Sequence, residues 1–154
     1  MQVPGVLAAV NIALAEASPA AAAATRCEEA QRAVVAALAI DAGHVPSLLL
    51  QAEVHAAAAK VAGRSGLDAT PHWHATRDAY RVVLQNPTKL GSCSERCTIR
   101  YNYACALSMC GEVDEAVDVL LSVAGKDPSA LQGAASDSEL AAIVSHPRLA
   151  PLLS

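Results

Sequence analysis

The order of hydrophobic and polar positions along the chain predicts helices, most clearly in residues 97–128. Apolar residues recur there at the i, i+3, i+4, i+7 spacing of one helix face, at Val117, Leu120, Leu121 and Ala124. Gly111 precedes this stripe, and glycine readily adopts the positive φ that ends a helix. Asp127-Pro128 then stops the second helix. The segment is therefore predicted to be two helices around a tight turn.

Residues 97–128 resemble the tetratricopeptide repeat, a helix–turn–helix unit of about 34 residues. With Cys97 as the first position of the repeat, characteristic residues fall in one phase at Asn102, Ala104, Gly111, Ala116, Leu120 and Pro128. The departures are Arg100, where the family prefers Trp, and Tyr103, where it prefers Leu. The resemblance implies an all-α, right-handed superhelix of stacked helix pairs.

Further copies of this pattern extend the predicted array over a single domain of residues 1–154. We expect about three repeats and a C-terminal cap, at about 4–42, 45–87, 97–128 and 129–153. The second repeat carries an insertion near 62–71, and residues 88–95 form another insertion. Pro19 and the run Ala20–Ala24 are expected to form an irregular linker at the first turn. In the cap, short closing helices would direct Leu140, Ile143 and Val144 inward.

Composition supports close helix packing and argues against several classes of protein. Alanine accounts for 35 of the 154 residues, and there is no Phe, one Trp and three Tyr. Alanine favours helices and lets their axes approach closely. The formal net charge is −4, with 11 Lys and Arg against 15 Asp and Glu. A nucleic-acid binder that relies on basic charge is therefore not expected.

The cysteines and the apolar segments indicate the cellular compartment in which the protein is expected. Cys97 and Cys105 would lie about 12 Å apart on one helix, too far for a disulfide. Reduced thiols are expected in all five cysteines, which favours a cytoplasmic protein. The N-terminal segment lacks the positive charge of a signal peptide. No stretch reaches the roughly 18–20 uninterrupted apolar residues that a membrane span needs.

The resemblance implies a partner-binding concave face on the first helix of each pair. Its positions here are Leu49 and Glu53 in the second repeat, and Thr98, Tyr101, Cys105, Ser108 and Met109 in the third. Family members that hold the acidic C-terminus of a chaperone use Lys, Arg and Asn on this face. The positions named here carry none of these residues, so a partner of that type is not expected. An apolar peptide or helix of a protein partner is the expected ligand. Alternatively, part of this face packs against the chain's own N-terminal helix or loops.

Two other functions were weighed against an interaction module. His72 and His74, with Cys93 and Cys97 about 20 residues later, offer four possible zinc ligands. Their spacing matches no zinc-finger pattern, and no catalytic or phosphate-binding motif is present, so neither a metal, a cofactor nor an enzyme is expected. A purely structural subunit, contacting partners through its convex face and residues 62–71 and 88–96, is the main alternative.

Overall fold

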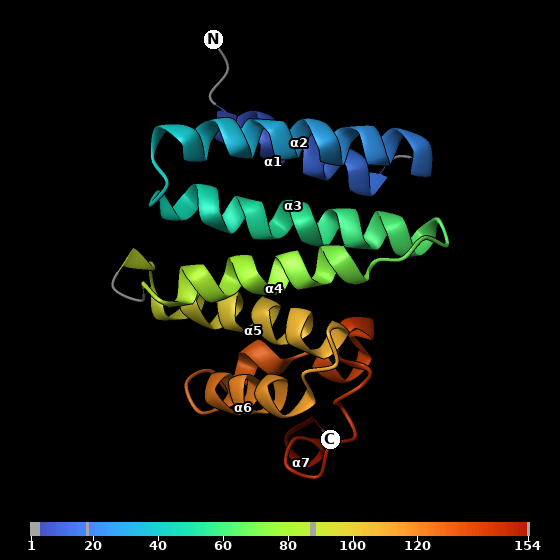
Figure 1. Ribbon diagram of the computed structural model, residues 1–154. Coiled ribbons are helices and arrows are strands. Elements are labelled where there is room, and N and C mark those ends of the chain that lie inside the picture. Colours follow the sequence, from blue (N-terminus) through green and yellow to red (C-terminus); the bar gives the residue numbers. More distant parts are fainter. Residues whose placement is uncertain (1–3, 18, 87–88, 154) are drawn as a thin grey trace. The chain divides into compact units, whose positions relative to one another are not determined.

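A computed structural model describes residues 4–17, 19–86 and 89–153 (Figure 1). Over these residues the chain is helical and contains no strand, which confirms the predicted all-α class. The chain divides into two compact units, Met1–Gln85 and Asn86–Ser154, called here the N-terminal and C-terminal units. Within the described residues, no helix has the length and apolar character needed to cross a bilayer.

The N-terminal unit consists of four helices, α1 (Pro4–Ala17), α2 (Ala20–Ile40), α3 (Val45–Arg64) and α4 (Thr70–Leu84). α1 packs against α2, and α3 packs against α4 (Figure 1). α3 also lies against both α1 and α2, so it joins the two helix pairs.

The helix contacts of the N-terminal unit are built mainly from small side chains. Two clusters of buried residues link α1, α2 and α3, and their members are Ala8, Ala30, Ala33, Val34 and Val54, and Ala15, Ala23, Cys27, Ala57 and Val61. A methyl group at a helix contact lets the two backbones approach closely, and each pair gains dispersion contacts over its length. This is the packing that the alanine content predicts.

Two expectations for the N-terminal unit were wrong. The run Ala20–Ala24 is not a linker but the beginning of α2, because alanine has the highest helix propensity. Pro19 precedes this helix at φ −56° and ψ 151°, a position where a missing N–H costs no helical hydrogen bond. The insertion expected near 62–71 is mostly absorbed by helices, since α3 continues to Arg64 and α4 begins at Thr70.

The C-terminal unit packs α5 (Cys93–Met109) against α6 (Val113–Ala124). Three short 3₁₀ turns follow, η2 (Pro128–Leu131), η3 (Ala134–Ser136) and η4 (Ser138–Leu140), and then α7 (Ala150–Leu153). Turn η4 lies against α5, and η2 lies against α6. The largest side chains that are fully buried in this unit are Leu107, Leu120, Leu140, Ile143 and Leu149.

The cap differs in part from the prediction. Leu140 and Ile143 face inward as expected, whereas Val144 is half-buried. Residues 138–140 form a 3₁₀ turn where a short closing helix was expected, whereas α7 is a short closing helix at Ala150–Leu153. The insertion predicted at 88–95 was also too long, because α5 begins at Cys93. A capping box starts this helix there, in which the Ser92 hydroxyl accepts a hydrogen bond from the Glu95 N–H at 3.2 Å.

Candidate functional site

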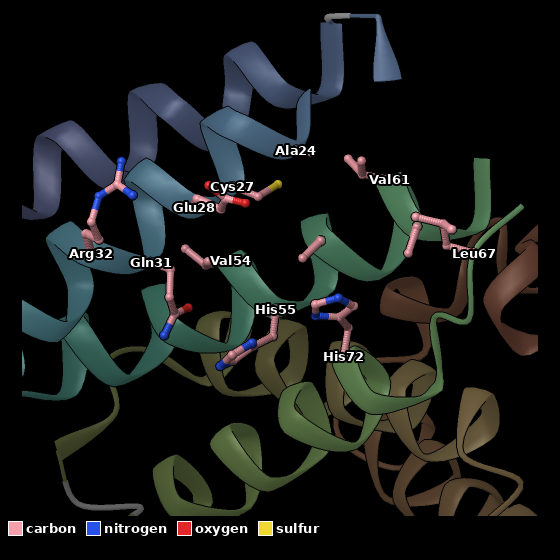
Figure 2. Close-up of a pocket in the computed structure, with 12 residues that line it drawn as sticks. Ala24, Cys27, Glu28, Gln31, Arg32, Val54, His55, Val61, Leu67 and His72 are labelled. Atoms are coloured by element: carbon pink, nitrogen blue, oxygen red, sulfur yellow. The ribbon is translucent and has the colours of Figure 1, made fainter. Parts of the chain in front are cut away.

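An apolar groove of about 490 Å³ lies on the N-terminal unit, between α2, α3 and the beginning of α4 (Figure 2). Its volume is in the range of protein ligand sites. The apolar residues that line it are Ala24, Val54, Ala58, Val61, Ala62 and Leu67. The other lining residues are Cys27, Glu28, Gln31, Arg32, His55 and His72.

The sequence of α3 explains the floor of the groove. Its lining residues 54, 55, 58, 61 and 62 recur at the spacing of one helix face. Ala58 and Ala62 are alanines on that face, and a larger side chain at either position would fill the space above the helix. The small size of these two residues therefore leaves a hollow on this face of α3.

A glycine turn at the end of α3 places a large apolar side chain at the groove. Gly66 has φ +69°, a conformation that side chains other than glycine rarely adopt. The next N–H, that of Leu67, donates to the Ala62 carbonyl at 2.9 Å and closes a Schellman motif. Leu67 then lines the groove while 68% of its surface remains exposed (Figure 2).

A buried polar atom on the α2 side lacks a hydrogen-bond partner. Gln31 lines the groove, and its Oε1 atom is shielded from solvent with no donor within reach. A buried acceptor left unsatisfied costs about 1–3 kcal/mol. Rotation of the Gln31 side chain toward the groove would let a bound donor satisfy this acceptor.

Two histidines lie on the α3 and α4 sides of the groove, His55 and His72 (Figure 2). Burial lowers the pKa of His55 below 6.5, and the charge of His72 lowers it further. His55 is therefore neutral at pH 7, and this wall of the groove carries no charge from it.

The lowered pKa of His55 predicts a loss of stability in acid. The unfolded chain binds this proton more readily than the folded one, so stability is complete above pH 6.5 and decreases as pH falls through the lower pKa of the folded state. We expect the thermal midpoint of the N-terminal unit to decrease when the pH is lowered from 7.5 to 5, and to decrease less in a His55→Gln variant. Thermal melts followed by Trp73 fluorescence measure both. Equal decreases of the midpoint in the two proteins would contradict a lowered pKa of His55 in the folded state.

Leu49 and Glu53, predicted to line a concave face, lie on the other side of α3 from the groove. At 3.6 residues per turn, their positions are about half a turn from Ala58 and Ala62. Leu49 is half-buried and Glu53 is exposed. The groove was not predicted, although the polar His55, which interrupts an apolar stretch of α3, was a signal for it.

Two of the five predicted contact residues of α5, Tyr101 and Cys105, lie against the chain's own C-terminal segment. The Tyr101 hydroxyl donates to Asp137 Oδ2 at 2.8 Å, and Cys105 Sγ lies 3.9 Å from the same oxygen. Cys105 and Ser108 are buried, whereas Met109 is 41% exposed and Thr98 is exposed. A loop of the same chain therefore occupies this face at Tyr101 and Cys105.

The four weak zinc candidates fall into two separate pairs. His72 and His74 are two residues apart on α4, so their side chains leave the helix in different directions. Cys93 and Cys97 are one turn apart at the beginning of α5, in the C-terminal unit. Burial and the neighbouring Cys93 raise the pKa of the Cys97 thiol, which favours its protonated form. None of the five cysteines forms a disulfide in the described chain.

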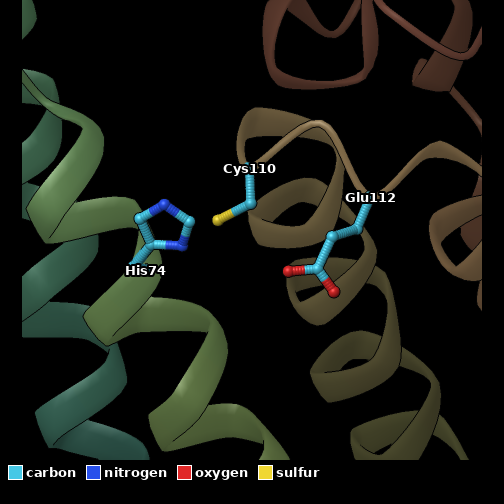
Figure 3. Close-up of side chains that lie close together, drawn as sticks. All are labelled: His74, Cys110 and Glu112. Carbon is cyan, nitrogen blue, oxygen red and sulfur yellow. The ribbon is translucent and has the colours of Figure 1, made fainter.

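The turn between α5 and α6 confirms the predicted role of Gly111, which has φ +77°. The N–H of Glu112 donates to the Leu107 carbonyl at 2.9 Å, and the N–H of Gly111 donates to the Ser108 carbonyl at 3.0 Å. Cys110 and Glu112 lie on the two sides of this turn; His74, also drawn, belongs to α4 of the N-terminal unit (Figure 3).

Comparisons with known proteins gave no match to a family model, to a curated protein or to a solved structure. The resemblance to the tetratricopeptide repeat therefore stays a prediction from sequence.

Proposed function

We propose that this protein is a helical binding scaffold and that its groove takes an apolar helix of a partner protein. The observation that carries the proposal is the apolar groove between α2 and α3, with the unsatisfied Gln31 acceptor in its wall. An apolar helix face would cover Leu67 and the alanines of the floor. A polar side chain on that helix would donate to Gln31 Oε1.

The charges of the groove favour a partner of this kind. Glu28 and Arg32, one residue of each sign, are exposed lining residues on the α2 side. His55 is neutral at pH 7, as its lowered pKa requires. Because no single sign of charge dominates, apolar contact would supply most of the affinity, and the two exposed charges would orient the partner.

The packing order of the N-terminal unit supports the tetratricopeptide-like part of the proposal. α3 contacts both helices of the preceding pair, as expected when helix pairs stack in succession. In such a scaffold the helices already hold the binding surface in place, so little conformational entropy is lost on the scaffold side when a partner binds.

The proposal is tested with two matched arginine substitutions on α3. Ala58→Arg places a long side chain in the groove, and we expect it to weaken partner binding by about tenfold or more. Ala56→Arg makes the same change on the other side of the helix, where the residue is also half-buried, and should leave affinity within about twofold. A partner is first captured and identified, and its dissociation constant for each variant is then measured by titration calorimetry.

The same measurements include Leu49→Ala, which tests the face predicted from the sequence resemblance. Circular dichroism confirms that each variant is helical. If Ala56→Arg and Leu49→Ala weaken binding while Ala58→Arg does not, the partner binds the opposite side of α3 and the groove proposal fails.

A further inference from the structure

One thiol and two carboxylates meet in the C-terminal unit. Cys105 comes from α5, and Asp137 and Glu139 come from the beginning of η4. Their sulfur and carboxylate oxygen atoms all lie within 4.8 Å of one another. The thiol is buried and the two carboxylates are half-buried. The cluster joins residues more than 30 positions apart in the sequence.

The local structure orients this cluster. Asp137 Oδ1 accepts the Glu139 N–H at 2.9 Å and so caps η4, while Oδ2 accepts the Tyr101 hydroxyl at 2.8 Å. The carboxylate of Asp137 is therefore held in place on the face of α5 that carries Cys105.

A separate observation points to a missing ligand on the same face. Ser108 lies one helical turn beyond Cys105, and its hydroxyl is buried with no hydrogen-bond partner. The whole residue is only 5% exposed. Tyr101, Cys105 and Ser108 follow the i, i+4, i+7 spacing of one helix face. Buried hydroxyl groups nearly always have a hydrogen-bond partner. A buried hydroxyl without one, on the helix face that carries a candidate metal ligand, therefore indicates an unfilled polar site.

We propose that Cys105, Asp137 and Glu139 bind one Zn²⁺ ion. A thiolate with two carboxylates suits zinc, whereas Ca²⁺ and Mg²⁺ prefer oxygen ligands alone. On binding, the sulfur–zinc bond forms as the Cys105 thiol releases its proton to solvent. Three protein ligands leave one tetrahedral position for water, and Ser108 is the polar group available to it. The ion would offset two of the three negative charges that the thiolate and the two carboxylates bring, and it would tie η4 to α5.

Cobalt replaces zinc as a visible probe of this site. The full chain is freed of metal with a chelator and titrated with Co²⁺, then with Zn²⁺. We expect one equivalent of Co²⁺ to give a thiolate-to-cobalt charge-transfer band, and Zn²⁺ to remove it. The band should be absent in Cys105→Ser and unchanged in Cys93→Ser, which removes a thiol elsewhere on α5.

A second variant separates metal binding from folding. Asp137→Asn keeps a residue that caps helical turns well, since its Oδ1 still accepts the Glu139 N–H while its Nδ2 can donate to the Tyr101 hydroxyl, but it removes one charged ligand. We expect it to remain helical and to bind Co²⁺ at least about tenfold more weakly. The proposal is overturned if stoichiometric Co²⁺ gives no band. It is also overturned if the band survives Cys105→Ser and disappears in Cys93→Ser, since the metal would then lie at Cys93 and Cys97.

Discussion

Replacing Leu107 with alanine is expected to lower the free energy of unfolding of the C-terminal unit by about 2–5 kcal/mol. Leu107 lies on α5 and is fully buried, at 0% exposure. The substitution loses the transfer free energy of the removed atoms and leaves a cavity. Hydrogen exchange of α6 backbone amides in urea reports the unfolding of this unit.

Leu152→Ala is the matched control, because it makes the same chemical change in the same unit. Leu152 lies on α7 and is 51% exposed. Its loss should cost less than about 1 kcal/mol, since surface substitutions are usually nearly neutral. Equal effects of the two substitutions would show that the core of the C-terminal unit is not where the structure places it.

Replacing Ala30 with leucine is expected to destabilise the N-terminal unit by about 1–3 kcal/mol. Ala30 lies on α2 at 0% exposure, in the cluster that includes Ala8 and Val54 of the neighbouring helices. A larger side chain there must separate helices that the alanines bring together. The buried Trp73 on α4 is the only tryptophan, so its fluorescence in urea follows this unit.

Ala36→Leu is the control for this second prediction. Ala36 is exposed on the same helix, and alanine and leucine have similar helix propensities. Its urea midpoint should therefore stay close to that of the unchanged protein. A leucine tolerated at Ala30 as well as at Ala36 would contradict the close packing of α2 described above.

The parts of the fold that the sequence predicts are those fixed by local rules. The turn at Gly111 follows from the conformational freedom of glycine, and the burial of Val117 and Leu120 follows from helical spacing. At the start of α2, the repeat phase predicts a linker over the alanine run, whereas the high helix propensity of alanine predicts the helix that forms there. There, the local rule was the better guide.

The candidate sites depend on contacts that no local pattern contains. The groove exists because the small side chains of Ala58 and Ala62 leave space between α2, α3 and α4, and the pKa of His55 is lowered by burial and by the charge of His72 in the folded chain. Likewise, Asp137 meets Tyr101 across 36 positions in the sequence. A single sequence gives the helix faces, but not the segment that covers each of them.

The central claim, that a partner occupies the groove between α2 and α3, is tested most directly by photo-crosslinking. A photoreactive amino acid replaces Leu67, which is exposed where it lines the groove, or Leu49 on the other side of α3. After irradiation of the complex, mass spectrometry identifies the joined peptides. We predict that position 67 crosslinks to one apolar helical segment of the partner and that position 49 does not. Crosslinks from position 49 alone would contradict the account.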